Sequence, residues 1–386
     1  MTGPKPSVRG SVDPFLVMDM LREANQIQAE GKNVIHMEAG QPSGSPPNCV
    51  IEAAQAALVS GRIGYTEALG IPPLRERIAE HYQDAYGIDI APGRVVVTTG
   101  SSSGFILSFL AAFDHGARVA LPVPGYPAYR NILAALGIEP VPIYTTADNR
   151  WAPTVADIQR LAATEQGLQG LLVASPANPT GTMIDRQTMN ALAGTCADNG
   201  IWFLSDEIYH RLTFAMEEAC GLSFNDDAIV INSFSKYYCM TGWRIGWMVV
   251  PERLVRPLEC LAQNLFISPP ALSQYAALAA FDATDELNER RAEYARNREL
   301  LLTELPKLGF ADFTPVDGAF YIYADVSSFT NDSHQFARKM LRDIGVAATP
   351  GADFDDRNGH RYIRFSFAGP TVEMREAIDR LGTWLK

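Results

Sequence analysis

The sequence predicts an α/β fold: a mainly parallel, seven-stranded sheet covered by helices on both faces, with a smaller α+β domain beside it. The first observation is that continuous apolar segments of strand length alternate with segments of helical length, which is typical of parallel sheets that are buried on both faces. The second is the length of 386 residues, which exceeds the size at which one hydrophobic core usually keeps growing. The seven expected strands are 95–98, 118–121, 139–143, 171–174, 201–205, 229–232 and 244–250.

Composition and charge argue against several classes of protein. A hydrophobic content of 47% is ordinary for a soluble globular protein, and no apolar segment approaches the length of a membrane span. The net charge of −12 argues against nucleic acid as the main partner. The first residues lack a charged region followed by an apolar one, so we expect no signal peptide.

The cysteines and histidines show no pattern of disulfide formation or metal binding. The five cysteines are scattered without paired spacing, which indicates reduced thiols in a cytoplasmic protein. Cys239 lies close to Lys236 in the sequence, but with no histidine nearby we interpret it as a small buried residue. The six histidines form no cluster with ligand spacing, so we expect no metal site.

The N-terminal part of the chain is expected to form a helix, a short strand and a second helix. Asp13 and Pro14 are the residue types of an N-cap and a first helical turn, and apolar residues follow at helical spacing. A short strand at 33–37 leads into a turn that contains Gly40. Residues 48–60 have the pattern of the second helix.

A strand, a turn of small residues and a helix follow one another after residue 94. The strand 95–98 ends in the turn 100–104, and a helix is expected at 105–113. Such a turn aims backbone N–H groups and a helix dipole at a phosphate, although turns of this kind also occur without a ligand. Neither an ATP-binding loop nor a dinucleotide-binding fingerprint is present.

We expect the chain to divide into two domains. Residues 46–285 form the large domain around the seven-stranded sheet, and a long polar helix at 285–305 leads out of it. The small domain is discontinuous and consists of residues 13–45 plus 286–386. Its C-terminal part is expected to contain a strand at 318–325, a helix at 333–344, a strand at 362–367 and a helix at 371–385.

Lys236 is the residue around which the candidate site is organised. The apolar strand 229–232 ends in Ser233 and Ser235 before this lysine, and Arg244 follows eight residues later. A free lysine has a pKa of about 10.4, and a strand end with a neighbouring arginine disfavours its ammonium form. A neutral amine that can form an imine is the expected result. Although a single lysine is most often a surface residue, the two serines and the arginine are the donors that a phosphate needs beside this amine.

Polar residues also follow the other strands of the predicted sheet. Asp206 and Tyr209 come after the strand 201–205, and Asn178 follows the strand 171–174. Ligands of parallel sheets collect outside the carboxyl ends of the strands. We therefore expect these side chains to lie together with Lys236 at one edge of the sheet.

Asn178, Asp206, Tyr209 and Lys236, in this order and spacing, resemble the class I/II aminotransferases, which are fold-type-I enzymes that use pyridoxal phosphate. The resemblance extends from Gly40 to Arg364, over most of the chain. It implies pyridoxal 5′-phosphate as cofactor, a catalytic Lys236 that holds it as an imine, and a homodimer in which each subunit completes the site of the other.

The resemblance also implies a role for each matching residue. Asp206 binds the pyridine nitrogen, Tyr209 and Asn178 bind the phenolic oxygen, and Tyr126 lies flat against the ring, whereas Tyr129 is the better candidate for a core residue. Gly40, Asn178 and Arg364 hold the substrate carboxylate, although Gln41 and Ser43 replace the two acids of the family's Gly-Glu-Pro-Asp turn. The cofactor phosphate is assigned to Ser101, Ser102, Ser233, Ser235, Arg244 and the Tyr65 of the partner subunit.

The function expected from these residues is transfer of an amino group between an α-amino acid and a 2-oxo acid such as 2-oxoglutarate. A C–S lyase or synthase on the same scaffold is an alternative, because the same residues bind the cofactor in both. The segment 100–115 contains no lysine or arginine to meet a distal carboxylate, which favours an apolar or aromatic donor. Aspartate stays open as a donor, since Arg62, Arg130 or Arg211 could supply the cation.

Overall fold

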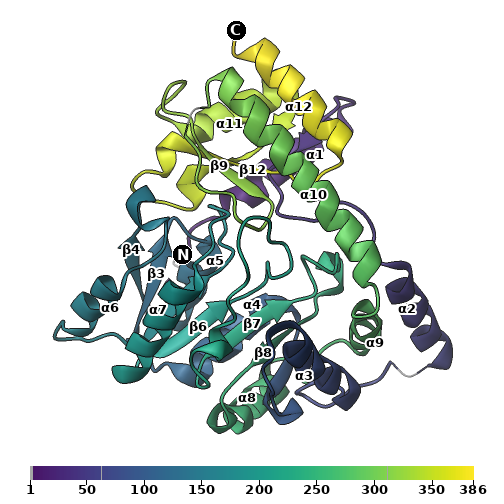
Figure 1. The fold of residues 1–386 in the computed structure, drawn as a ribbon, viewed down its shortest axis with the longest axis vertical. Helices are drawn as coiled ribbons and strands as arrows, with labels where there is room; N and C mark the ends of the chain where they lie inside the picture. Colours follow the sequence, from purple (N-terminus) through teal and green to yellow (C-terminus); the bar gives the residue numbers. More distant parts are fainter. Residues whose placement is uncertain (1–2, 62, 311) are drawn as a thin grey trace.

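A seven-stranded sheet forms the centre of the lower part of the molecule in the computed structural model, which describes residues 3–61, 63–310 and 312–386 (Figure 1). Its strand order is β2-β8-β7-β6-β5-β3-β4. The neighbours from β4 to β7 are parallel, and β8 is antiparallel to both β7 and β2. This confirms the predicted mainly parallel sheet. The strands are β2 (Val95–Thr98), β3 (Arg118–Val123), β4 (Glu139–Tyr144), β5 (Gly170–Ala174), β6 (Trp202–Asp206), β7 (Ile229–Ser233) and β8 (Gly246–Val249).

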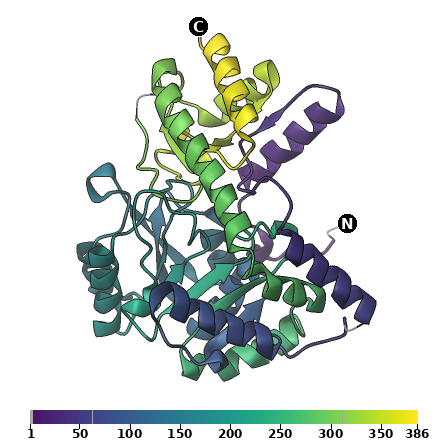
Figure 2. The same cartoon turned by 45° about the vertical axis from the view of Figure 1, so that its right-hand side comes forward.

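Helices cover both faces of this sheet, because its strands are apolar on both sides (Figures 1 and 2). In β7, Ile229 and Ile231 pack into a cluster with α4, α5 and α8, whereas Val230 between them packs into the main core with α3, α6, α7 and α9. The helices of this part are α2 (Asn48–Ser60), α3 (Pro72–Tyr86), α4 (Gly100–Ala112), α5 (Pro127–Leu136), α6 (Val155–Ala162), α7 (Arg186–Asp198), α8 (Glu252–Leu265) and α9 (Ala271–Ala280).

Two smaller sheets lie above the large one in Figure 1. The three-stranded, antiparallel sheet has the order β11-β12-β9, and β1 pairs in parallel with β10. Helix α10 runs from α9 up to these sheets and packs against α12. Their strands are β1 (Ile35–His36), β9 (Tyr321–Asp325), β10 (Val346–Ala347), β11 (Thr349–Pro350) and β12 (Tyr362–Ser366). Their helices are α1 (Leu16–Ala29), α10 (Thr284–Glu304), α11 (Ser333–Ile344) and α12 (Thr371–Trp384).

Several boundaries differ from the sequence-based expectation, and three of them bear on the cavity described below. Helix α1 begins at Leu16 and not at Asp13, because its first amides are capped by the distant Asp353, whose carboxylate accepts from Leu16 N at 3.0 Å and Val17 N at 3.1 Å. Helix α4 begins at Gly100, so the turn expected at 100–104 is its first turn. Arg244 precedes β8 and does not belong to it, because its φ of 51° is incompatible with an extended strand.

None of the helices in the described parts of the chain is long and apolar enough to cross a membrane. The five cysteines are free thiols, and Cys239 is buried in the main core as expected. The cysteines therefore contribute packing and no covalent cross-link.

Phe234 anchors the loop that carries Lys236, and its truncation is predicted to destabilise the protein. Its side chain is fully buried, and its ring centroid lies 4.8 Å from that of Trp247 and 5.4 Å from that of Phe281. We expect Phe234→Ala to lower the free energy of unfolding by about 4 kcal/mol, because it leaves a cavity in a packed core. Urea denaturation measures this, with the exposed Val372→Ala as control. A loss below about 1 kcal/mol would contradict the prediction.

Candidate active site

The polar strand ends of the large sheet meet the small sheets around a cavity of about 330 Å³. Most of the residues predicted for the site line this cavity, although they come from segments far apart in the sequence. They are Gly40, Ser101, Ser102, Tyr126, Asn178, Asp206, Tyr209, Ser235, Lys236, Arg244 and Arg364.

Lys236 points its amine into the cavity, where Nζ donates to the carbonyl oxygen of Gly40. Burial lowers the pKa of this amine to about 8, and the guanidinium groups of Arg364 and Arg244 act in the same direction. Asp206 opposes them, since a nearby carboxylate favours the ammonium form. A substantial fraction of the amine is therefore neutral, and hence nucleophilic, at mildly alkaline pH.

Asp206 is a buried carboxylate at the end of β6. It accepts hydrogen bonds from the hydroxyl of Tyr129 and from the backbone N–H of Ile208, at 3.0 Å for the latter. Burial raises its pKa to about 6, while these two hydrogen bonds lower it. A protonated ring nitrogen placed against this carboxylate would compensate the buried charge.

Tyr129 and Tyr321 belong to the site but were not predicted as site residues. Tyr129 is buried as expected, yet its hydroxyl reaches Asp206, and the hydroxyl of Tyr321 lies 2.7 Å from that of Tyr209. The spacing of Tyr126 and Tyr129 was the available signal for the first, because residues i and i+3 share one side of a helical turn. Tyr321 lies on a distant strand, and no local pattern indicates its contact.

Arg364 is held rigidly, with part of its guanidinium group left without a partner. Its side chain is 2% exposed, Nη1 donates to Asn178 Oδ1 at 2.8 Å, and Nη2 donates to Thr349 Oγ1 at 3.1 Å and to the carbonyl oxygen of Glu38. The guanidinium group also lies 4.3 Å from the ring centroid of Tyr321. Nε has no hydrogen-bond acceptor. Such a buried, unsatisfied donor is suited to an anionic ligand.

A second group of donors surrounds the N-terminus of α4. Ser101 and Ser102 lie in its first turn, and Ser235 and Arg244 line the cavity beside them. At Gly100, with a φ of 74°, a Cβ atom would lie 2.4 Å from a terminal nitrogen of Arg244. Glycine at this position therefore lets the guanidinium group approach the helix end, where backbone N–H groups point outward.

Ser233 and Tyr65 do not reach the cavity within one subunit. The Ser233 hydroxyl lies 2.9 Å from Ser235 Oγ and 3.0 Å from the carbonyl oxygen of Ile245, in the wall behind the lining residues. The side chain of Tyr65 is 85% exposed. Ser233 thus contacts the site through Ser235, and Tyr65 does not line the cavity of its own chain.

Apolar side chains form the wall opposite these polar groups. Phe15, Met18 and Leu21 from the α1 region and Phe105 from α4 line the cavity. Phe15 contacts the ring of Tyr126 edge to face, with a centroid distance of 5.7 Å. The part of the cavity nearest α1 is therefore suited to an apolar group.

The cations that could meet a second carboxylate lie elsewhere in the described parts of the chain. Arg130 lines a neighbouring cavity of about 400 Å³ and donates to the carbonyl oxygen of Asp353 at 2.9 Å. Arg211 lies 4.4 Å above the ring centroid of Tyr237. Arg62 is outside the described residues. The cations among the described lining residues are Lys236, Arg244 and Arg364.

Comparison with known proteins finds aminotransferases, both in sequence and in structure. A family model described as aminotransferase class I and II matches residues 32–381. The chain is 49% identical to the valine–pyruvate aminotransferase of Mycobacterium tuberculosis, over 98% of both chains. It is 35% identical to the (5-formylfuran-3-yl)methyl phosphate transaminase of Methanocaldococcus jannaschii, over 97% of both. The crystal structure of an aminotransferase from Mycobacterium tuberculosis is similar, with a TM-score of 0.96 at 48% identity and 99% coverage of both chains.

The raised pKa of Asp206 predicts how the stability of the ligand-free protein depends on pH. The folded carboxyl, with a pKa of about 6, binds its proton more tightly than the unfolded one, whose ordinary value is 3.8. Stability should therefore fall as the pH rises through this window, and change little further from this group above about pH 7.

Asp206→Asn should remove this pH dependence. We expect the ligand-free variant to be more stable than the original protein at pH 7.5, by up to about 3 kcal/mol, and the difference to vanish near pH 4. Urea titrations between pH 4 and 8 measure this, with the exposed Asp114→Asn as control. If the free energies of unfolding of the original protein and of Asp206→Asn differ by the same amount at every pH, the prediction is wrong.

Proposed function

Because this chain belongs to the class I and II aminotransferases, we propose that it transfers the amino group of an apolar α-amino acid to a 2-oxo acid with pyridoxal phosphate as cofactor. The observation that carries this proposal is the convergence of Lys236, Asp206 and Arg364 on one cavity with an apolar wall. Each of these three groups meets a different part of a cofactor and substrate pair.

The residues around the cavity fit this cofactor. When bound, pyridoxal phosphate supplies an electron sink for negative charge at the substrate α-carbon. Lys236 would hold it covalently through Nζ, and Asp206 would face its ring nitrogen. Tyr209 and Asn178 would face the phenolic oxygen, and Tyr126 the face of the ring.

The phosphate subsite would be the N-terminus of α4 together with its hydroxyl and guanidinium groups. Ser101, Ser102, Ser235 and Arg244 supply donors there, and Ser233 supports Ser235 from behind. A helix N-terminus favours an anion, and a guanidinium group adds charge-assisted hydrogen bonds.

The substrate carboxylate would bind at Arg364. Its contact with Asn178 keeps the guanidinium group in place next to the backbone of Gly40, and its unpartnered Nε is available to an incoming anion. Lys236 is the group that moves the proton, since its lowered pKa of about 8 lets Nζ accept a proton from the α-carbon and release it again.

The choice of donor follows from the charges that line the cavity. Arg244 and Arg364 are assigned to the phosphate and the α-carboxylate, so a second substrate carboxylate would lack a cation in the described part of the site. Phe15, Met18 and Leu21 offer an apolar surface instead. The relative named valine–pyruvate aminotransferase supports an aliphatic donor. Pyruvate suits the same wall better than 2-oxoglutarate, because it has no second carboxylate.

We propose that the active form is a homodimer. Tyr65 is 85% exposed, and apolar side chains near it in the sequence, at the C-terminal end of α8 or just after it are exposed as well. These are Leu58, Val59, Ile63, Leu265 and Ile267. A surface of this kind favours association, and a twofold axis would bring the Tyr65 of the partner subunit to each phosphate subsite.

We further propose a cytoplasmic location and a division into a large domain of residues 46–285 and a small domain of residues 13–45 plus 286–386. Five free cysteines support a reducing compartment. The separate sheets support the division into domains. Each domain would contribute to the cavity: Asp206, Lys236 and Arg244 from the large one, and Arg364 from the small one.

A half-reaction screen tests the donor. Twenty amino acids are added separately to the protein loaded with pyridoxal phosphate, and the shift of the cofactor absorption band is followed. We expect valine and other apolar donors to react at least about tenfold faster than aspartate, because an unpaired carboxylate is costly to bury. Lys236→Ala, which should show no covalent cofactor band, is the control.

Two results of this screen would overturn the proposal. A faster reaction with aspartate would contradict the apolar donor. Release of pyruvate and ammonia from a cysteine derivative, without conversion of the cofactor by any donor, would favour a C–S lyase.

Mixing two inactive variants tests the shared active site. Tyr65→Phe and Lys236→Ala should each have strongly reduced activity alone. After subunit exchange, a mixed dimer would contain one complete site, so activity should recover to about a quarter of the original value. The control is each variant taken alone through the same subunit-exchange procedure. Absence of recovery, or full activity of a monomer, would contradict the shared site.

A further inference from the structure

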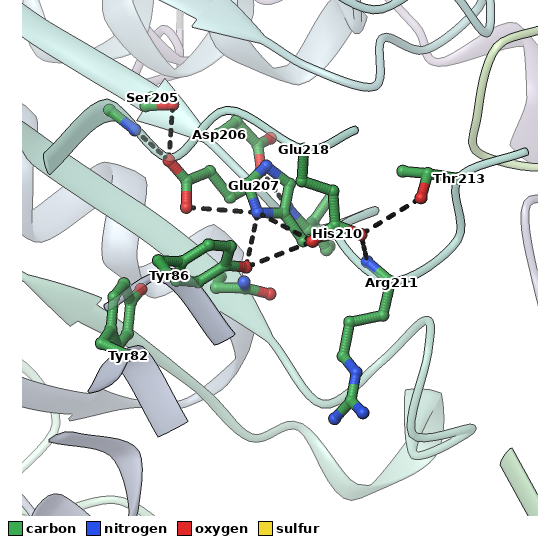
Figure 3. Close-up of polar contacts among 12 residues, drawn as sticks. Tyr82, Tyr86, Ser205, Asp206, Glu207, His210, Arg211, Thr213 and Glu218 are labelled. Atoms are coloured by element: carbon green, nitrogen blue, oxygen red, sulfur yellow. Dashed lines mark hydrogen bonds and ion pairs between the residues drawn. The ribbon is translucent and has the colours of Figure 1, made fainter. Parts of the chain in front are cut away.

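The segment from Asp206 to Arg211 has two sides with different environments (Figure 3). Asp206 and Tyr209 line the cavity, whereas Glu207 and His210 are turned into a buried polar cluster beneath it. Two residues that would touch the cofactor thus alternate along the chain with two residues that do not.

Glu207 is the most deeply buried acid of this cluster. Its side chain has no exposed surface, and Oε1 accepts from Gly221 N at 2.7 Å and from Ser205 Oγ at 3.0 Å. Oε2 has no hydrogen-bond partner and lies 3.5 Å from Nδ1 of His210. His210 is therefore the polar side chain that faces this remaining oxygen.

His210 ties the segment to helix α3 and to Glu218. Its Nδ1 lies 2.7 Å from the hydroxyl oxygen of Tyr86 and 3.7 Å from Glu218 Oε2 (Figure 3). Tyr86 in turn donates to Glu218 Oε2 at 3.4 Å. Burial raises the pKa of Tyr86 well above its usual range, and Glu218 and Glu207 add to the effect. The hydroxyl therefore keeps its proton and stays a donor.

Arg211 extends these contacts to the loop of Lys236. Its backbone has a φ of 70°, a left-handed conformation that is costly for a side chain other than glycine, and its N–H donates to the Glu218 carboxylate. Its guanidinium group lies over the ring of Tyr237, the residue after Lys236. The contact of its backbone with Glu218 and the contact of its side chain with Tyr237 both support this conformation.

We propose that Glu207 and His210 are positioning residues for the reaction: together they fix the segment that carries Asp206 and Tyr209, and so hold the Asp206 carboxylate towards the ring nitrogen of the cofactor. This inference rests on the proposed function. Burial dominates the raised pKa of Asp206, but Glu207 raises it further and His210 lowers it. The other titratable or charged groups that face the cluster are Arg77, His81, Tyr82, Tyr86, Arg211, Glu218 and Cys220.

The test is a spectroscopic pH titration of the loaded protein between pH 5 and 10. The absorption band of cofactor bound to Lys236 changes where its protonated, cationic form loses a proton. Glu207→Gln removes a negative charge that stabilises this cation, so the midpoint should move to lower pH. His210→Gln removes the contact of the segment with Tyr86 and Glu218, so the Asp206 carboxylate would be held less firmly against the cofactor and would stabilise the cation less. This midpoint should also move to lower pH, and each shift should be about half a pH unit.

His81→Gln is the matched control. His81 is a buried histidine of α3 whose ring lies 5.9 Å from that of Tyr86, and burial lowers its pKa to about 3. This replacement therefore disturbs the same core without changing a charge near neutral pH, and the midpoint should not move.

A midpoint that falls in both variants, with no shift in the control, supports the inference, because the control disturbs the packing of the same core. It is overturned if either midpoint rises or stays with that of His81→Gln. If His210→Gln does not fold, a midpoint of Glu207→Gln that does not fall decides against it. Failure of the unaltered protein to take up pyridoxal phosphate would refute the proposed function instead.

Discussion

An excess of positive charge in one cavity is the constraint on which the candidate site depends. Lys236, Arg244 and Arg364 face a single carboxylate, that of Asp206, among the described residues that line it. The protein as a whole carries a net charge of −12, so this local excess is a property of the fold and not of the composition. Like charges and burial disfavour the ammonium form of the lysine. Anionic ligands at the two arginines would relieve the repulsion, which couples ligand binding to the protonation of the amine.

At two positions the backbone lies very close to the side chains of the site, and both positions are glycines. A Cβ atom at Gly100 would collide with Arg244, and one at Gly40 would lie 2.0 Å from the hydroxyl of Tyr321. Glycine at both positions lets α4 and the segment after β1 approach the site, so that backbone groups and not only side chains line it. The carbonyl oxygen of Gly40 already accepts from Lys236 Nζ. The geometry of the site is therefore determined largely by the main chain.

Sequence patterns that depend on neighbouring residues predicted the fold well. Contacts between segments far apart in the sequence could not be predicted in this way. The alternation of apolar strands and helices predicts the seven-stranded sheet, and the polar residues after strands such as β5, β6 and β7 predict which side chains meet. The cap of α1 by Asp353 and the contact of Tyr321 with Tyr209 join residues 336 and 112 positions apart, and no local pattern encodes them. The left-handed backbone of Arg244, after which β8 begins only at Gly246, is not indicated by the apolar pattern of this segment either.

The apolar wall and Arg364 are parts of one structural unit, which would link the proposed choice of donor to the proposed binding of its carboxylate. Asp353 caps α1, which carries Met18 and Leu21, and it follows β11 directly. In β11, Thr349 accepts from Arg364 at 3.1 Å. A displacement of this unit relative to the large sheet would move both the wall and the guanidinium group over Lys236. If the proposed function holds, recognition of an apolar side chain by α1 would therefore favour the same arrangement in which Arg364 would meet the substrate carboxylate.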